Sequence, residues 1–176
     1  FQFLSVEYNP TQGIERFQEK ARKRVATDSE LERINTGLGV WMRHEEHRKR
    51  QFARLFFTLL FTAARKSEWT NARPEQVDFE NSVLNLEDSK TGEKTVPIPD
   101  ICHQVIKDAI NDDFDGFIFT YKQHDSTYKL FKKEYELGDL TIHDLRRTYA
   151  TIAAEAGVPM QEISKMLGHS SIKVTE

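Results

Sequence analysis

The side chains best able to do chemistry in this sequence are basic, and their charge suits a phosphate ligand. His143 and Arg146 lie three residues apart in the segment LTIHDLRRTYATIAAEAG, so a helix would bring them close together near its N-terminus. The free amides and the helix dipole at that end favour an anion. Taken alone, the pair has a simpler explanation, namely an N-terminal histidine and an exposed arginine that pairs with Asp144 or Glu155.

Three further segments carry a basic side chain at a predicted break between elements. Arg65 follows a strongly apolar run, and because burying an unpaired guanidinium is costly, Glu68 one turn later is its expected partner. Lys90 lies in the predicted turn SKTGEK, and His169 follows a predicted helix end at Leu167-Gly168. Each signal is weak by itself, because turn lysines and loop histidines are usually only solvated.

The order of these residues resembles that of the tyrosine recombinases, the phage integrase family. The segment from Thr62 to Glu68, TAARKSE, is similar to the family's T-G-x-R-x-S-E box, with Ala63 in place of the usual glycine. The segment SKTG followed by TVPIP resembles the family's β-hairpin and the strand after it. Asn9-Pro10 and the basic stretch to Arg24 resemble the linker between two domains. The resemblance covers nearly the whole chain.

The resemblance implies a role for each basic residue. Arg65 and Arg146 would offer forked donors to the non-bridging oxygens of a DNA phosphate. Lys90 would protonate the leaving 5′-oxygen. His143 would accept or share the proton of a tyrosine nucleophile, and His169 would donate a hydrogen bond to the phosphate. The implied catalytic residues are Arg65, Lys90, His143, Arg146 and His169, with Glu68 supporting Arg65, and the implied DNA-binding residues are Lys90, Thr91 and Arg147.

The reaction implied by the resemblance is site-specific DNA recombination, as in integration or excision. A tyrosine hydroxyl attacks the phosphate, a 3′-phosphotyrosyl link forms and a 5′-hydroxyl leaves, and a 5′-hydroxyl of another strand reverses the step. Because the covalent link stores the bond energy, the reaction needs neither ATP nor a nicotinamide, so no cofactor is expected. No metal is expected either, because no tight acidic cluster has the spacing of a paired-metal site. The implied partners are a double-stranded recombination site, further integrase subunits in a synaptic complex and DNA-bending accessory proteins, but no membrane.

The family's nucleophilic tyrosine is expected shortly after Glu176, outside this sequence. We therefore expect residues 1–176 to bind DNA weakly and to cleave none. Residues 1–26 are expected to be the end of an N-terminal DNA-binding domain and the linker after it, and residues 27–176 an integrase-type catalytic domain that ends before the tyrosine. The first residue, Phe1, also favours a fragment over a whole gene product.

Other functions remain open at the level of sequence. A non-catalytic relative could keep the fold and the phosphate pocket as a DNA-binding protein. A type IB topoisomerase, which shares the chemistry, would relax supercoils without site preference. A protein-interaction domain with no DNA role would show no salt-dependent DNA affinity. Within the recombinases, the sequence does not distinguish a phage from another mobile genetic element.

The elements that must position these residues follow from the apolar periodicity. It predicts an α+β fold that is mostly α-helical, with a small three-stranded antiparallel β-sheet, as in the integrase catalytic fold. Gly37 and Gly39 are expected to interrupt the helical pattern after a capping box at Thr27. Leu145, Tyr149, Ile152, Ala153 and Ala156 are expected to form the buried face of their helix. Helices are expected over 28–38, 44–64, 100–110, 126–137, 143–156 and from Pro159 to Gly168, and strands over 77–79, 83–86 and 95–98.

Composition excludes several classes of protein. The longest apolar run, 55–64, is too short to cross a bilayer. The single cysteine, Cys102, excludes an internal disulfide and a cysteine-rich zinc site, which favours the cytoplasm. His44 and His47 lie one residue too close for the zinc-protease helix motif. The net charge of -3 leaves room for a basic face, because residues 1–75 carry 14 basic and 10 acidic side chains while residues 76–140 carry 7 and 14.

Overall fold

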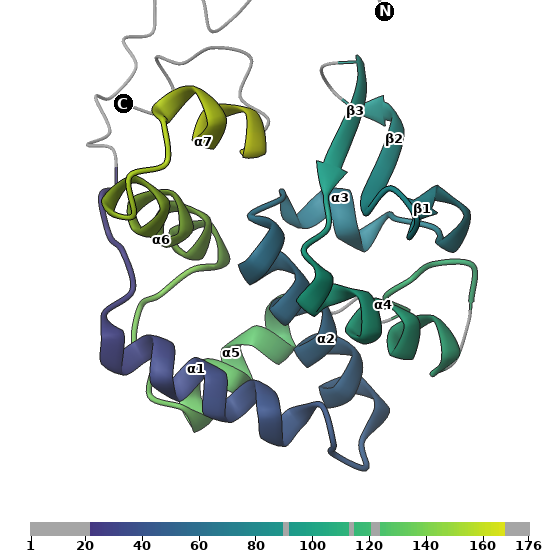
Figure 1. The fold of residues 1–176 in the computed structure, drawn as a ribbon. Coiled ribbons are helices and arrows are strands. Elements are labelled where there is room, and N and C mark those ends of the chain that lie inside the picture. Colours follow the sequence, from purple (N-terminus) through teal and green to yellow (C-terminus); the bar gives the residue numbers. More distant parts are fainter. Residues whose placement is uncertain (1–21, 90–91, 113–114, 121–123, 168–176) are drawn as a thin grey trace, which may run out of the picture.

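The architecture is a set of helices with one small sheet inserted between them, as expected (Figure 1). The computed structural model describes residues 22–89, 92–112, 115–120 and 124–167. The element order is α1 (Asp28–Trp41), α2 (His47–Thr62), α3 (Lys66–Thr70), a 3₁₀ turn at Pro74–Gln76, β1 (Val77–Asp78), β2 (Val83–Ser89), β3 (Gly92–Pro97), α4 (Asp100–Asn111), α5 (His124–Glu134), α6 (Ile142–Glu155) and α7 (Met160–Met166).

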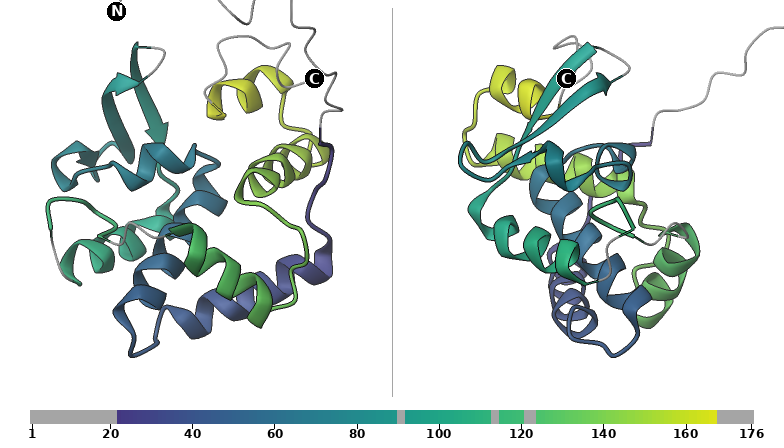
Figure 2. Two further views of the ribbon diagram at one scale, coloured as in Figure 1. Left: turned by 180° about the vertical axis from the view of Figure 1, so that it is seen from behind. Right: turned by 90° about the vertical axis from the view of Figure 1, so that its right-hand side faces the viewer.

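Helix α2 is the centre of the fold, with α1, α4, α5 and α6 packed around it. One apolar cluster joins α2 to the sheet and α4 and includes Leu55, Trp69 and Ile106. A second joins α2 to α1 and α5 and includes Trp41 and Phe131. The sheet and the α6–α7 pair lie on opposite sides of α2 (Figures 1 and 2). Helix α2 therefore sets the spacing between the sheet and the α6–α7 pair, and site residues were predicted in both of these parts of the sequence.

The sheet is an antiparallel meander in the order β1-β2-β3, which confirms the prediction. Leu84 pairs with Val77 on one side and with Val96 on the other. Lys94, Val96 and Ile98 alternate toward the interior, and all three are at least partly buried. The inward face of β3 thus brings a lysine as well as apolar side chains against α3.

The first helix runs through both glycines that were expected to interrupt it. Gly37 and Gly39 lie inside α1, which continues to Trp41. A Cβ atom at Gly37 would come within 2.8 Å of the rings of Phe131 and Tyr135, so the glycine allows α5 to approach closely. Tertiary packing has overridden the low helix propensity of glycine here.

The predicted buried face of α6 is wrong in its second half. Leu145 is buried, and Tyr149 and Ala153 pack partly against Ala63, Ile163 and Leu167. Ile152 is 49% exposed, and Ala156 is also exposed. The apolar period identifies one side of a helix, but it does not say how far along the helix the neighbouring elements extend.

The N-terminal half of α2 holds the C-terminal end of α4 through a two-arginine clamp on Asp112. Arg50 Nη2 donates to Asp112 Oδ1 at 2.8 Å, and Arg54 Nη1 also donates to this carboxylate. Gln51 donates to the Ala109 carbonyl at 3.1 Å. The hydrogen bond from Arg50 is the largest cause that lowers the pKa of Asp112 to about 2.

Asp112→Asn is expected to lower the free energy of unfolding at pH 7 by about 1–3 kcal/mol, because two arginines lose an ionised acceptor. The folded-state pKa lies below the unfolded value, so this contribution is complete above about pH 5 and is lost as the pH falls toward 2. Urea denaturation of both proteins across this range should show two stabilities that converge at the acid end. A difference independent of pH would contradict the clamp.

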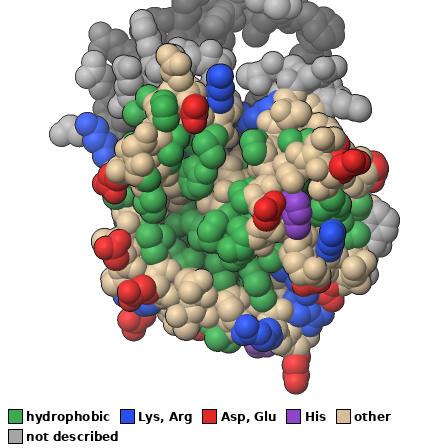
Figure 3. All heavy atoms as spheres, viewed as in Figure 1, with side chains coloured by type: hydrophobic (Ala, Val, Ile, Leu, Met, Phe, Trp, Pro, Cys, Tyr) green, Lys and Arg blue, Asp and Glu red, His purple; other side chains and the backbone are tan. Residues whose placement is uncertain are grey.

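The face of the molecule seen in Figure 1 is apolar at its centre. Hydrophobic side chains gather there over a hollow, and charged side chains lie mainly around the rim (Figure 3).

None of the helices in the described ranges combines the length and the apolar content that crossing a bilayer requires.

Candidate active site

Three of the predicted catalytic residues line one cavity of about 480 Å³. Arg65 comes from the α2–α3 junction, and His143 and Arg146 come from the first turns of α6. Helix α5 also lines the cavity, with Lys129 and Lys132. The complete lining is Ala64, Arg65, Lys66, Asp125, Tyr128, Lys129, Lys132, Thr141, Ile142, His143 and Arg146. Five of these residues are lysine or arginine and one is an acid, so the cavity is basic although the chain is weakly acidic.

A left-handed residue at the end of α2 directs Arg65 into the cavity. Ala63 has a φ of 49°, and its N–H donates to the Leu59 carbonyl at 3.1 Å, which ends the helix. Two residues later Arg65 caps α3 in an extended conformation. A left-handed position favours glycine. This accounts for the family's preference at the site where this chain has Ala63.

Glu68 binds both the backbone and the side chain of Arg65, the partner that the sequence suggested for it. Its Oε2 accepts from the Arg65 backbone N–H at 2.9 Å, and its Oε1 accepts from Arg65 Nη1 at 3.2 Å. Glu68 is only 8% exposed, and its Oε1 also accepts from Lys94 Nζ at 2.7 Å. Burial alone would raise the pKa of Glu68, but the hydrogen bonds from Lys94 and Arg65 bring it below its ordinary value. The carboxylate is therefore ionised, as an orienting partner of Arg65 must be.

Lys94 is a residue of the site that the sequence prediction missed. It lies on the inward face of β3, and its only signal is the period-2 alternation with Val96 and Ile98. A lysine at a buried position of a strand needs a carboxylate partner. Glu68, the acid already expected to hold Arg65, is that partner.

Lys94→Met is expected to destabilise the fold by about 1–3 kcal/mol, because the buried Glu68 carboxylate loses its shortest hydrogen bond. Adding Glu68→Gln should recover part of the loss, so the two effects should not add. Urea denaturation measures both, with the exposed Lys165→Met as control. Strict additivity would contradict a direct pairing.

Arg146 ties together two segments of the site. It is 8% exposed, Nη1 donates to the Ala63 carbonyl at 2.5 Å, and Nη2 donates to the Leu167 carbonyl. These bonds use two of the five guanidinium N–H donors, and the side chain also lines the cavity. Burial is the main cause that lowers the pKa of Arg146 to about 10, and repulsion by Arg65 adds to it. Arg146 therefore stays charged at neutral pH, and an anion between the two arginines would relieve their mutual repulsion.

The start of α6 is built by a capping box. Thr141 Oγ1 accepts from the Asp144 N–H at 3.2 Å, and the Asp144 carboxylate accepts from the Thr141 N–H at 2.9 Å. His143 is exposed at this end and lines the cavity. Arg147, a predicted DNA-binding residue, is not in the lining, and its Nη1 lies 3.7 Å from Asp144 Oδ1.

Two lysines on α5 and Lys66 are cavity residues that sequence reasoning did not single out. Lys66 pairs with Asp125 at 2.7 Å, and Lys132 Nζ lies 5.4 Å from the centre of the Tyr128 ring. In the sequence these three lysines look like lysines on solvated helix faces.

Three predicted site residues, Lys90, Thr91 and His169, lie outside the described residues.

Among the described residues, the two tyrosines near the cavity, Tyr128 and Tyr149, do not resemble a nucleophile. Tyr128 lines the cavity, but it is buried and its hydroxyl donates to the Leu140 carbonyl at 2.9 Å. Burial raises the pKa of Tyr128 and also that of Tyr149. Tyr149 packs against the Ala63, Ile163 and Leu167 cluster, in keeping with the predicted core role. In the described ranges, no three His, Cys, Asp or Glu side chains gather in a way that could hold a metal ion.

The sequence matches the model of a family described as the phage integrase family over residues 24–176. The chain belongs to this family. The integrase match begins in the segment just before α1 and takes in Arg65, His143 and Arg146. A similar curated relative is the tyrosine recombinase XerA of Thermococcus onnurineus, 32% identical over 137 residues, which cover 70% of this chain and 49% of XerA. The chain spans about half the length of the curated relatives it matches first.

Solved structures show the same integrase fold. The catalytic domain of bacteriophage HP1 integrase superimposes with a TM-score of 0.67 at 20% identity, covering 88% of this chain and 85% of that one. The Tn1549 transposon integrase, solved in complex with circular intermediate DNA, gives a TM-score of 0.68 at 20% identity and covers 96% of this chain and 64% of that one. The expected integrase catalytic fold is thus confirmed.

Proposed function

We propose that the protein performs site-specific recombination of double-stranded DNA, in which strands are cleaved and rejoined through a 3′-phosphotyrosyl link. The observation that carries the proposal is the basic cavity that Arg65, His143 and Arg146 share within an integrase fold. A DNA phosphate is the anion that these donors would bind. The curated relatives named as tyrosine recombinases support the same chemistry.

In the proposed mechanism, the two arginines bind the non-bridging oxygens, where negative charge grows in the transition state. Glu68 orients Arg65, and the Ala63 and Leu167 carbonyls orient Arg146. His143 accepts or shares the proton of the attacking tyrosine. Lys90 protonates the leaving 5′-oxygen, and His169 donates a hydrogen bond to the phosphate. The nucleophile of the proposed step is a tyrosine, as in the relatives named tyrosine recombinases.

The assembly belongs to the same proposal. Residues 1–26 would be the end of a DNA-binding domain and its linker, and residues 27–176 the catalytic domain. Further integrase subunits would join in a synaptic complex, and accessory proteins would bend the DNA. The complex of the Tn1549 integrase with DNA supports the DNA partner.

The proposal is tested by trapping the covalent intermediate. The protein as its gene encodes it is incubated with nicked duplexes from the gene's own genomic neighbourhood, and adducts that resist denaturation are isolated. We expect an adduct at a tyrosine, joined to a 3′-phosphate. Stable DNA binding with no adduct would instead favour a non-catalytic relative.

The cavity lysines are expected to contribute to DNA binding. Replacing Lys129 and Lys132 by alanine should weaken the binding of DNA by residues 1–176 and should lower the slope of log affinity against log salt by about one for each lysine. Lys165→Ala is the control, because this exposed lysine on α7 does not line the cavity. Fluorescence anisotropy over a range of salt concentrations measures the slopes. Equal slopes for all variants would exclude α5 from the DNA-binding surface.

A further inference from the structure

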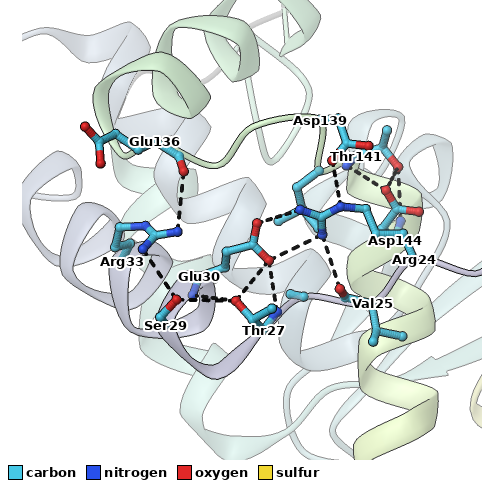
Figure 4. A network of polar contacts seen from close by, with 12 residues as sticks. Arg24, Val25, Thr27, Ser29, Glu30, Arg33, Glu136, Asp139, Thr141 and Asp144 are labelled. Atoms are coloured by element: carbon cyan, nitrogen blue, oxygen red, sulfur yellow. Dashed lines mark hydrogen bonds and ion pairs between the residues drawn. The ribbon is translucent and has the colours of Figure 1, made fainter.

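The segment before α1 is fastened across the first turns of α6. We call residues 22–26 the strap. The Ala26 N–H donates to Thr148 Oγ1 at 2.8 Å, and both residues are buried. Figure 4 shows Arg24 and Val25 beside Asp139, Thr141 and Asp144. The strap therefore contacts the helix that carries His143 and Arg146.

The main attachment of the strap is a forked contact between Arg22 and Asp144. Arg22 Nε lies 3.0 Å from each carboxylate oxygen of Asp144, and Nη2 donates to the Asp139 carbonyl oxygen at 3.0 Å. Nη2 also contacts Asp139 Oδ2 at 2.9 Å. The Asp144 side chain is 1% exposed, whereas that of Arg22 is 43% exposed. The guanidinium thus covers a buried carboxylate from the solvent side.

Asp144 has a specific place in α6, because it closes the capping box that starts this helix. Its Oδ2 accepts from the N–H and the hydroxyl of Thr141 at 2.9 and 2.8 Å. Asp144 directly follows His143 and comes two residues before Arg146 in the sequence. A shift of this carboxylate would move the helix start, and with it the two cavity residues.

A second arginine joins the strap to α1. Arg24 Nε donates to Asp139 Oδ1 at 2.7 Å, and Arg24 Nη2 donates to Glu30 Oε1 at 2.5 Å (Figure 4). Glu30 is the acid of the capping box that starts α1. Two helix starts are therefore connected through the strap.

We propose that Arg22 is a positioning residue of the active site, which holds the N-terminus of α6 through Asp144 and so sets the places of His143 and Arg146. This inference rests on the proposed recombinase function for its catalytic consequence. A small displacement of a catalytic group lowers the rate of the chemical step much more than it lowers the affinity for DNA, because the reacting atoms must be held in near-attack geometry. The loss of Arg22 is expected to affect the chemical step more than DNA affinity.

Arg22→Gln in the whole gene product tests the catalytic consequence. The rate of adduct formation at saturating DNA is expected to fall by roughly 10- to 100-fold, with DNA affinity close to that of the unsubstituted protein. Arg33→Gln is the matched control, because Arg33 also donates to backbone carbonyls, but those of Tyr135 and Glu136, which lie outside α6. An unchanged rate for Arg22→Gln in a protein that cleaves DNA would overturn the proposal, as would an equal loss in Arg33→Gln.

A double-variant cycle separates action through Asp144 from a general effect. Asp144→Asn keeps one acceptor oxygen for Thr141 but removes the charge that Arg22 binds. If Arg22 acts through Asp144, adding Arg22→Gln to the Asp144→Asn protein should lower the rate of adduct formation only a little further. Full additivity of the two rate losses would contradict the proposal.

Hydrogen exchange gives a readout that does not depend on recombination. In residues 1–176, Arg22→Gln should speed the exchange of the amides of Leu145 to Thr148 relative to those of α4, while Arg33→Gln should not. Unchanged exchange in α6 would overturn the positioning role. If Arg22→Gln speeds exchange in α6 but the unsubstituted protein forms no adduct with DNA, the positioning role of Arg22 is upheld and the proposed recombinase function is rejected.

Discussion

Replacing Arg146 by methionine is expected to lower the rate of adduct formation by the whole gene product about 10²- to 10³-fold, under the proposed function. The guanidinium would stabilise charge on the phosphate, and its bonds to the Ala63 and Leu167 carbonyls also tie α6 to the end of α2 and to the end of α7. Methionine fills a similar volume without replacing either contribution. Single-turnover kinetics at saturating DNA measure the loss.

Arg146→Lys and Arg43→Met make this prediction specific. The lysine keeps the charge, but its compact ammonium cannot reproduce the planar fork that reaches two carbonyls, so only part of the rate should return. Arg43 is exposed and does not line the cavity, so its loss should leave the rate unchanged. Inorganic phosphate should raise the melting temperature of residues 1–176 but not that of the Arg146→Met variant. A methionine variant that cleaves DNA normally would remove Arg146 from the site.

The types of the elements could be predicted from sequence because each has a strong local pattern. The sheet follows from three short β-favouring runs separated by turn residues, and α4 follows from its apolar period. The continuation of α1 through Gly37 could not be predicted, because it depends on the rings of Phe131 and Tyr135, almost one hundred residues away in the sequence. The prediction of which α6 residues are buried was wrong in its second half for the same reason, because burial there depends on how far distant elements extend along the helix.

The site was predictable only where residues stand in a recognisable order. Arg65, His143 and Arg146 were expected together on the resemblance, and they share a cavity. Lys94 and Lys129 have no such signal, because a lysine that touches a buried carboxylate or a cavity looks the same in sequence as a solvated one. The chain's net charge of -3 likewise concealed a basic cavity, since acids elsewhere outweigh it.

Trp41→Ala is expected to cost about 3–5 kcal/mol of the free energy of unfolding, the largest effect on stability that we predict. Trp41 is fully buried where α1, α2 and α5 meet. Its ring makes edge contacts with Phe52 at 5.7 Å and with Phe131 at 4.9 Å between ring centres. Its Nε1–H donates to Glu134 at 3.0 Å. The substitution would leave a cavity between three helices and remove one of the donors to Glu134.

Trp41→Phe separates these two contributions, because it keeps an aromatic ring and loses the hydrogen bond to Glu134. It should cost much less than the alanine variant, as measured by urea denaturation. Because α5 rests on this cluster and also forms the lysine wall of the cavity, Trp41→Ala should weaken DNA binding even where most molecules remain folded. A loss of stability below about 1 kcal/mol for Trp41→Ala would mean that α1 is not packed on α2 and α5 as described.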